Sequence, residues 1–237
     1  MSRCLRRLAA LLVCVPCIGV GADDAGTDAR GRATQGAVAE DAGGARASAV
    51  SQSATATSRE DLTLGRIDAD HDDGYLYRLP YGDDVSFPII QGYGAKLSHR
   101  GAERFTLDFG MPVGTSVHAA RDGVVVLSED SHDVGCAREE CGRFANFVVV
   151  LHSDGTTGEY FHLERGSVQV RVGESVARGQ SLARSGNTGF STAPHLHFGV
   201  YRTARERTTE SLAVRFETRR GAVGAPRSGA RYLNPLD

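Results

Sequence analysis

Short apolar runs separated by glycine-containing turns are the feature that most constrains this fold. Gly123–Leu127 and Asn146–Leu151 are near-continuous apolar runs, and each predicts a strand buried on both faces. Ser153–Thr156 contains Asp-Gly, which is a hairpin signal. No segment has a 3.6-residue apolar period of helical length, and the 29 glycines favour turns. We therefore expect an all-β fold with an antiparallel sheet at its core and little helix.

Composition divides the chain into four parts. Residues 23–60 are mostly Ala, Gly, Ser and Thr, and such a segment buries too little apolar surface to offset its ordering entropy, so we expect a disordered linker. Residues 61–218 form the expected folded domain, with its motif-bearing core at 75–218. Residues 219–237 are expected to be a C-terminal tail. Within the domain, Arg202–Glu210 is predicted to be a short polar helix or a loop.

The first 22 residues have the pattern of a secretory signal peptide. Arg3, Arg6 and Arg7 form a basic region ahead of the apolar run Leu8–Val20, and Val20-Gly21-Ala22 resembles a cleavage site. The run is short for a membrane span. We therefore expect export, either to the periplasm or out of the cell, and no transmembrane span in the mature chain.

The cysteines and the charge agree with an exported protein. Of five cysteines, three would leave with the signal peptide, and Cys136 and Cys141 would remain. A closely spaced pair in an exported chain predicts a disulfide. The net charge is −2 for the whole chain and becomes about −5 once three arginines are removed, which argues against a nucleic-acid partner. We expect a monomer.

The candidate site residues are histidines and an aspartate near strand ends. In His195-Leu196-His197-Phe198, strand alternation would put both histidines on one face. Asp108 alternates with Phe105, Leu107 and Phe109, and His99 lies in the loop before them. His162 is predicted to share a face with Tyr160, whereas His152, beside a turn, is expected to be exposed.

These side chains have the chemistry of a catalytic metal site. Catalytic zinc takes three N or O ligands and keeps one open position, and it makes water a stronger acid. His99, Asp108 and one histidine of the His195/His197 pair could supply the ligands. The spacing does not decide which of the pair binds metal, and it leaves a purely structural site open.

Three stretches together resemble the lysostaphin/LytM-type zinc metallopeptidases. They are Ser98-His99 through Asp108-Phe109 with Pro112-Val113-Gly114-Thr115, then Tyr160-Phe161-His162-Leu163, then Ser185-Gly186-Asn187-Thr188-Gly189 through His195-Leu196-His197-Phe198. The resemblance implies an antiparallel β core with a groove over one sheet. It implies Zn²⁺ held by His99, Asp108 and His197, with His162 and His195 as the catalytic pair. It departs from the family at one point, because eight residues rather than three separate His99 from Asp108.

The resemblance also implies a function. The expected activity is a zinc endopeptidase that hydrolyses peptide bonds in peptidoglycan stems or cross-links, and Tyr160 and Asn187 are candidate substrate-binding residues. Two alternatives remain at this stage. One is a non-catalytic module that binds peptidoglycan or activates an amidase, and the other is an exported zinc protease acting on proteins.

Overall fold

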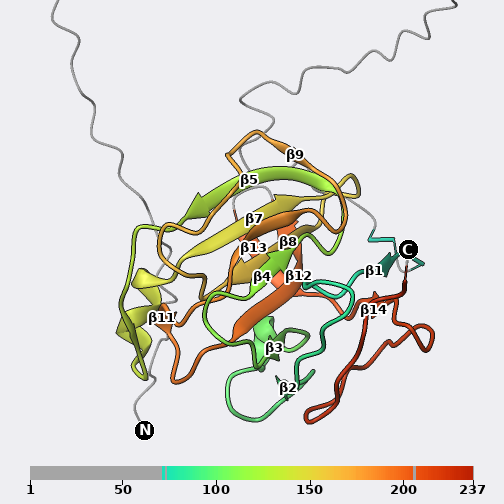
Figure 1. The fold of residues 1–237 in the computed structure, drawn as a ribbon, viewed down its shortest axis with the longest axis horizontal. Helices are drawn as coiled ribbons and strands as arrows, with labels where there is room; N and C mark the ends of the chain where they lie inside the picture. The colour runs from blue at the N-terminus through green and yellow to red at the C-terminus, as the bar shows by residue number, and fades with distance from the viewer. Residues whose placement is uncertain (1–70, 73, 205–206, 237) are drawn as a thin grey trace, which may run out of the picture. The chain divides into compact units, whose positions relative to one another are not determined.

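The computed structural model describes residues 71–72, 74–204 and 207–236. The predicted signal peptide and linker, together with residues 61–70, lie outside the described residues. Within the described part, the regular elements are fourteen β-strands and two 3-10 helices, η1 and η2, so the all-β prediction is confirmed (Figure 1). No helix in that part is long and apolar enough to cross a membrane.

The elements follow one another in this order: β1 (Leu76–Tyr77), β2 (Ile89–Gln91), η1 (Gly101–Glu103), β3 (Leu107–Phe109), β4 (Ser116–His118), β5 (Gly123–Glu129), β6 (Gly135–Cys136), η2 (Glu139–Phe144), β7 (Phe147–Leu151), β8 (Thr157–Phe161), β9 (Ser175–Val176), β10 (Ser181–Arg184), β11 (Gly189–Phe190), β12 (Leu196–Ala204), β13 (Arg207–Ser211) and β14 (Arg215–Phe216).

One large antiparallel sheet organises the fold. Its strand order is β2-β3-β12-β8-β7-β5-β9, and β13 pairs with the later part of β12. In Figure 1, the orange β12 therefore lies beside strands from much earlier in the chain. Two-stranded pairs surround this sheet: β4 with β10, β1 with β14, and β6 with β11. The antiparallel core expected from the sequence is confirmed.

Strand alternation places the hydrophobic core on one face of β12. Leu196, Phe198 and Val200 are each no more than 1% exposed, and they pack with Leu107 and Phe109 of the neighbouring β3. The intervening residues of β12 point to the opposite face. One face of β12 thus packs into the hydrophobic core, and the opposite face is available for polar side chains.

Two local predictions are wrong. Residues 202–204 and 207–210 form neither a helix nor a loop, because they belong to the antiparallel strands β12 and β13, in which Arg202 pairs with Glu210. The run Gly123–Leu127 is not buried on both faces, because Leu127 is 44% exposed. On this side of β5, β9 pairs with the first two residues, and Val125 exchanges backbone hydrogen bonds with Gly173 and Glu174. The rest of β5 lies at an edge of the sheet.

The fold extends beyond residue 218, where the tail was expected to begin. Asn234 is fully buried. Its Oδ1 accepts a hydrogen bond from Leu79 N at 2.9 Å, and its Nδ2 donates to Tyr81 O at 2.6 Å. The backbone of Ala230 accepts a hydrogen bond from Ile89 N at 2.9 Å. Residues 219–236 therefore hold the segment that leads into β2.

Candidate metal centre and its histidines

A single row of paired residues crosses four strands and forms the floor of the site. Gln91 on β2 pairs with Asp108 on β3, and Asp108 pairs with His197 on β12. His197 in turn pairs with Phe161 on β8. Directly paired residues of neighbouring strands point to the same face. Sheet register thus brings Asp108 and His197 together although they are far apart in sequence.

His99 reaches the same place from the loop between β2 and β3. Its side chain is buried, with Nδ1 3.1 Å from Gly92 O and Nε2 3.2 Å from Asp108 Oδ1. His197 Nδ1 lies 2.8 Å from the same Oδ1 atom. One ligand atom each from His99, Asp108 and His197 lie within 4.8 Å of one another. The structure therefore brings together the three residues expected to hold metal.

The donor atoms fit a cation. A carbonyl oxygen only accepts hydrogen bonds, so the contact with Gly92 places the hydrogen of neutral His99 on Nδ1. Its Nε2 then directs a lone pair at the Asp108 carboxylate, and this buried nitrogen has no hydrogen-bond partner among the described residues. Two facing acceptors require a positive charge between them. Two imidazoles and one carboxylate are a ligand set that suits zinc.

The pKa values of Asp108 and His197 also indicate a site that suits a cation. Burial alone would raise the pKa of Asp108, but the hydrogen bond from His197 and the imidazoles around the carboxylate outweigh it and hold that pKa well below its usual range. Burial alone would lower the pKa of His197, but the hydrogen bond to Asp108 and the nearby Glu103 raise it to about 10. Without metal, a proton on His197 balances the carboxylate. Metal must displace this proton, so metal affinity falls at low pH.

His162 reaches the site through an unusual backbone conformation. It follows the last residue of β8 and has φ of 65°, the one positive value among described non-glycine residues. Its Nδ1 lies 2.6 Å from Thr188 O, which places the hydrogen on Nδ1. Burial, together with the His195 and His197 imidazoles, lowers the pKa of His162 to about 3. His162 is therefore neutral with an unprotonated Nε2.

The prediction that Tyr160 and His162 share a face is wrong. Tyr160 is fully buried in the hydrophobic core, where its ring packs against Phe198. Its hydroxyl accepts a hydrogen bond from Ala120 N at 2.8 Å. The residue of β8 that faces the site is Phe161, the partner of His197. The buried position of Tyr160 removes it as a candidate substrate-binding residue.

His195 stands beside His162, with their ring centroids 4.5 Å apart. Its Nδ1 lies 2.8 Å from Ala193 O, so Nδ1 carries the hydrogen and Nε2 is free, 3.8 Å from Asp108 Oδ1. Burial lowers the pKa of His195. The two histidines expected to be catalytic thus lie together, each held through Nδ1 by a backbone carbonyl.

Asn187, the other candidate substrate-binding residue, is linked to His195 through Ser191. Its Oδ1 accepts a hydrogen bond from Ser191 Oγ at 2.7 Å. That Ser191 oxygen also lies 3.2 Å from His195 Nδ1. The described contact of Asn187 therefore braces the loop that carries His195.

Three residues of the site were missed by sequence reasoning. Gln91 Nε2 donates a hydrogen bond to Asp108 Oδ2 at 2.6 Å, which leaves Oδ1 to face the histidines. The Tyr201 hydroxyl donates to Glu103 Oε2 at 2.5 Å, and the same oxygen lies 3.6 Å from His197 Nε2. Tyr201 could have been found, because it follows His197 by four residues on one strand face. Gln91 and Glu103 depend on register and loop conformation, which give no local pattern.

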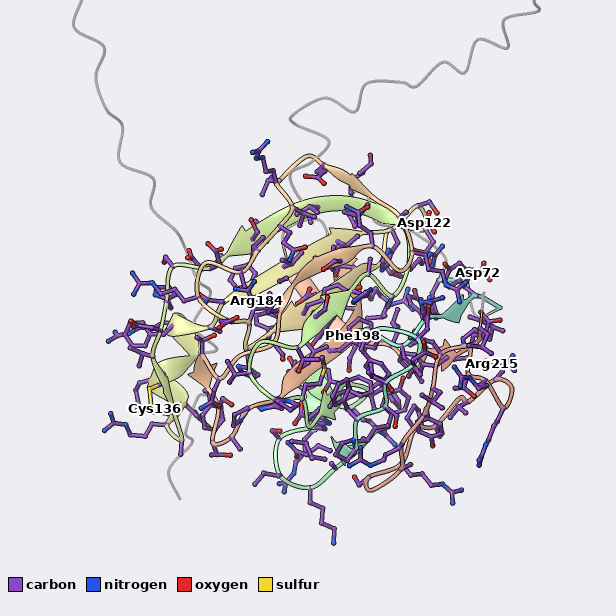
Figure 2. All side chains as sticks on the ribbon, viewed as in Figure 1. Asp72, Asp122, Cys136, Arg184, Phe198 and Arg215 are labelled. Atoms are coloured by element: carbon purple, nitrogen blue, oxygen red, sulfur yellow. A yellow bond between two sulfur atoms is a disulfide. The ribbon has the colours of Figure 1, made fainter. Side chains whose placement is uncertain are left out.

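The insertion between β5 and β7 packs against the loop that carries His195. Within it, Cys136 and Cys141 are joined by a disulfide, with Cα atoms 5.9 Å apart. Figure 2 shows this yellow bond near the label Cys136, beside η2. Strand β6 pairs in parallel with β11, and a Cβ on Gly135 would lie 1.8 Å from Asn187 O. Glycine at 135 thus permits a backbone contact too close for any side chain.

Another histidine, His152, is buried rather than exposed as expected. Its side chain lies in contact with Tyr77, at a ring-centroid distance of 5.8 Å, and its Nδ1 lies 2.9 Å from Asp122 O. The turn exposes Ser153 next to it, but the ring folds inward over Gly158. Burial lowers the pKa of His152 to about 4.

Comparisons with known proteins give one consistent family. The model of peptidase family M23 matches residues 103–209, so His99 lies just upstream of the matched region. The chain is 40% identical over 91 residues to peptidoglycan DD-endopeptidase ShyA of Vibrio cholerae, an alignment covering 38% of this chain and 18% of that protein. It is 37% identical over 109 residues to lysostaphin of Staphylococcus simulans, covering 45% of this chain and 20% of that protein.

Among solved structures, a zinc-containing peptidase from Vibrio cholerae shows 29% identity and a TM-score of 0.41, with 56% of this chain and 38% of that chain covered. The matched region spans about a fifth of the length of the two curated relatives.

Proposed function

From its peptidase family M23 domain at residues 103–209, we propose that this chain is an exported zinc-dependent endopeptidase that hydrolyses peptide bonds in peptidoglycan stems or cross-links. The observation that carries the proposal is the convergence of His99, Asp108 and His197 beside two neutral histidines. A purely structural metal site would have no use for two unprotonated imidazole nitrogens at its edge.

We assign His99, Asp108 and His197 as the residues that hold zinc. Bound zinc supplies a Lewis acid, which polarises a peptide carbonyl and makes water a stronger acid. Gln91 holds the second oxygen of Asp108, so a single carboxylate oxygen is presented between His99 and His197.

His162 and His195 are assigned to proton transfer. A general base near neutral pH needs an unprotonated nitrogen within reach of water. Each of these histidines anchors Nδ1 on a backbone carbonyl and leaves Nε2 free. Either histidine can accept the proton of the attacking water at Nε2 and, once protonated, deliver that proton to the leaving nitrogen. The second imidazole, 4.5 Å away between ring centroids, can accept a hydrogen bond from the water at its own Nε2.

The substrate assignment rests on the relatives. One is named a peptidoglycan DD-endopeptidase, and the chain is 40% identical to it over 91 residues. Export to the compartment that holds cell wall would follow from the signal-like residues 1–22. The proposal places the mature protein in the periplasm or outside the cell.

The test is a digest of purified peptidoglycan with zinc-loaded protein, followed by chromatography and mass spectrometry of the fragments. We expect cross-linked fragments to fall and new free amino groups to appear, and chelation to abolish both changes. His197→Ala protein is the matched inactive control. Cleavage of protein substrates without any change in peptidoglycan would replace the proposed substrate. Unchanged fragments and uncleaved proteins, beside an active control enzyme, would refute the proposal.

A further inference from the structure

The outer nitrogen of His197 faces two oxygen atoms. Nε2 lies 3.6 Å from Glu103 Oε2 and 3.5 Å from the Tyr201 hydroxyl oxygen. The Tyr201 hydroxyl donates its hydrogen to that same Glu103 oxygen, at 2.5 Å. Both oxygens therefore present lone pairs toward His197.

This arrangement selects one tautomer of the imidazole. A nitrogen facing two acceptors is favourable only when it carries the hydrogen. With the hydrogen on Nε2, the lone pair of neutral His197 lies on Nδ1, the atom 2.8 Å from Asp108 Oδ1. Nδ1 is thus the nitrogen that faces the candidate ligand Asp108.

The chain builds this contact from two places. Glu103 lies in η1, within the long segment between His99 and Asp108. Tyr201 follows His197 on the same face of β12, and Gly199 lies between them. A Cβ on Gly199 would lie 2.7 Å from the Tyr201 ring, so glycine leaves room for the ring to lean back toward His197.

We propose that Glu103 and Tyr201 are positioning residues that fix the tautomer and ring orientation of His197 for metal binding. The inference rests on the proposed function, because it takes His197 as a zinc ligand. It also gives the unusually long spacing between His99 and Asp108 a role, since the additional residues form the turn that carries Glu103. Groups that bond the outer nitrogen of a ligating histidine typically change metal affinity by about 10–100-fold.

The experiment measures zinc affinity of the full chain by competition with a chromogenic chelator. The variants are Glu103→Gln, Tyr201→Phe and their combination, and the matched control is Glu140→Gln on the exposed surface of η2. We expect the zinc Kd to rise about 10–100-fold in Glu103→Gln and less in Tyr201→Phe. The combination should cost little more than Glu103→Gln alone, because Tyr201 acts through Glu103.

A second readout separates positioning from folding. In imidazole ¹⁵N spectra of the zinc-loaded protein, we expect a slowly exchanging His197 Nε2–H signal that broadens in Glu103→Gln. Circular dichroism in EDTA should show all variants folded. Wild-type protein that binds no zinc would refute the proposed function and this inference together. Wild-type protein that binds zinc, with Kd and Nε2–H signal unchanged in both single variants, would refute only this inference.

Discussion

Two backbone carbonyls set the tautomers of the two histidines beside the candidate metal centre. Thr188 O and Ala193 O each take the Nδ1 hydrogen, so the free lone pairs lie on Nε2 of His162 and His195. Asp108 and His197 have the opposite character, because each is charged without metal and the two pair with one another. The proposed zinc ligands and the proposed proton carriers thus differ in charge because their immediate neighbours differ.

This separation predicts different losses from single substitutions. His195→Ala and His162→Ala should each lower kcat by about 10²–10⁴-fold, because each removes a proton-transfer group, while zinc remains bound. Asp108→Ala and His197→Ala should lose zinc itself. Zinc content by plasma mass spectrometry, measured beside kcat, separates the two classes. Loss of zinc in His195→Ala would contradict the assignment.

At this scale the sequence predicts side-chain direction only where the backbone is regular. Alternation through residues 195–198 correctly suggested that both histidines of the His-x-His pair would face the same way, toward Asp108. The same rule failed at His162, because its positive φ turns the chain and moves the ring off the face of Tyr160. Gln91 was missed because its pairing with Asp108 follows a register shift in β2.

Among the elements, the disulfide-closed insertion is coupled to the loop of His195. Strand β6 pairs with β11, and Ser191, which contacts His195, follows β11 directly. A loosened insertion should therefore disturb proton transfer more than metal binding.

We expect Cys136→Ser/Cys141→Ser protein to lose about 2 kcal/mol of unfolding free energy, the entropy expected for so short a loop. Its kcat should fall while zinc Kd stays within about two-fold of wild type. Urea unfolding and kinetics, with and without a phosphine reductant, provide the measurement. Wild-type protein under reductant should behave like the double variant, and the double variant should not respond to reductant.

Element type was predictable where apolar residues alternate or cluster, as in β5 and β7. The hairpin of β12 and β13 was not, because its residues 202–210 are mostly polar and carry no apolar period. Its pairing comes from β12, which is fixed in the sheet by its apolar first half.

At the scale of the whole molecule, buried neutral histidines make the folding stability sensitive to acid. His152 has a pKa near 4 when folded and near 6.5 when unfolded. Between these two pKa values the unfolded chain binds more protons than the folded chain. The contribution of His152 to folding stability is therefore complete above pH 6.5 and is lost as the pH falls toward 4. We expect metal-free protein to lose about 3 kcal/mol from His152 over this range.

Urea unfolding in EDTA at a series of pH values measures this loss, with His152→Asn as the comparison. The unfolding free energy of the variant should depend less steeply on pH. The pH dependence that comes from His162 should remain. The raised pKa of His197 acts above pH 6.5 and leaves this window unaffected. Equal slopes in both proteins would contradict the assignment.

The C-terminal segment closes the fold and should matter for global stability. Asn234→Ala leaves buried backbone groups of Leu79 and Tyr81 without partners, so we expect a loss of at least about 2 kcal/mol. Arg231→Ala, on the exposed side of the same segment, should change stability by about 0.5 kcal/mol or less. Chemical denaturation compares them, and equal effects would contradict a specific role for Asn234.

The left-handed backbone at His162 implies that this site opposes the folding of its own chain. A histidine at φ of 65° costs about 1–2 kcal/mol relative to residues that tolerate this conformation. His162→Asn should therefore unfold at a higher temperature than wild type while its kcat falls by about 10²–10⁴-fold, as calorimetry and kinetics would show. The backbone at residue 162 thus trades thermal stability for the position of an imidazole beside the candidate metal centre.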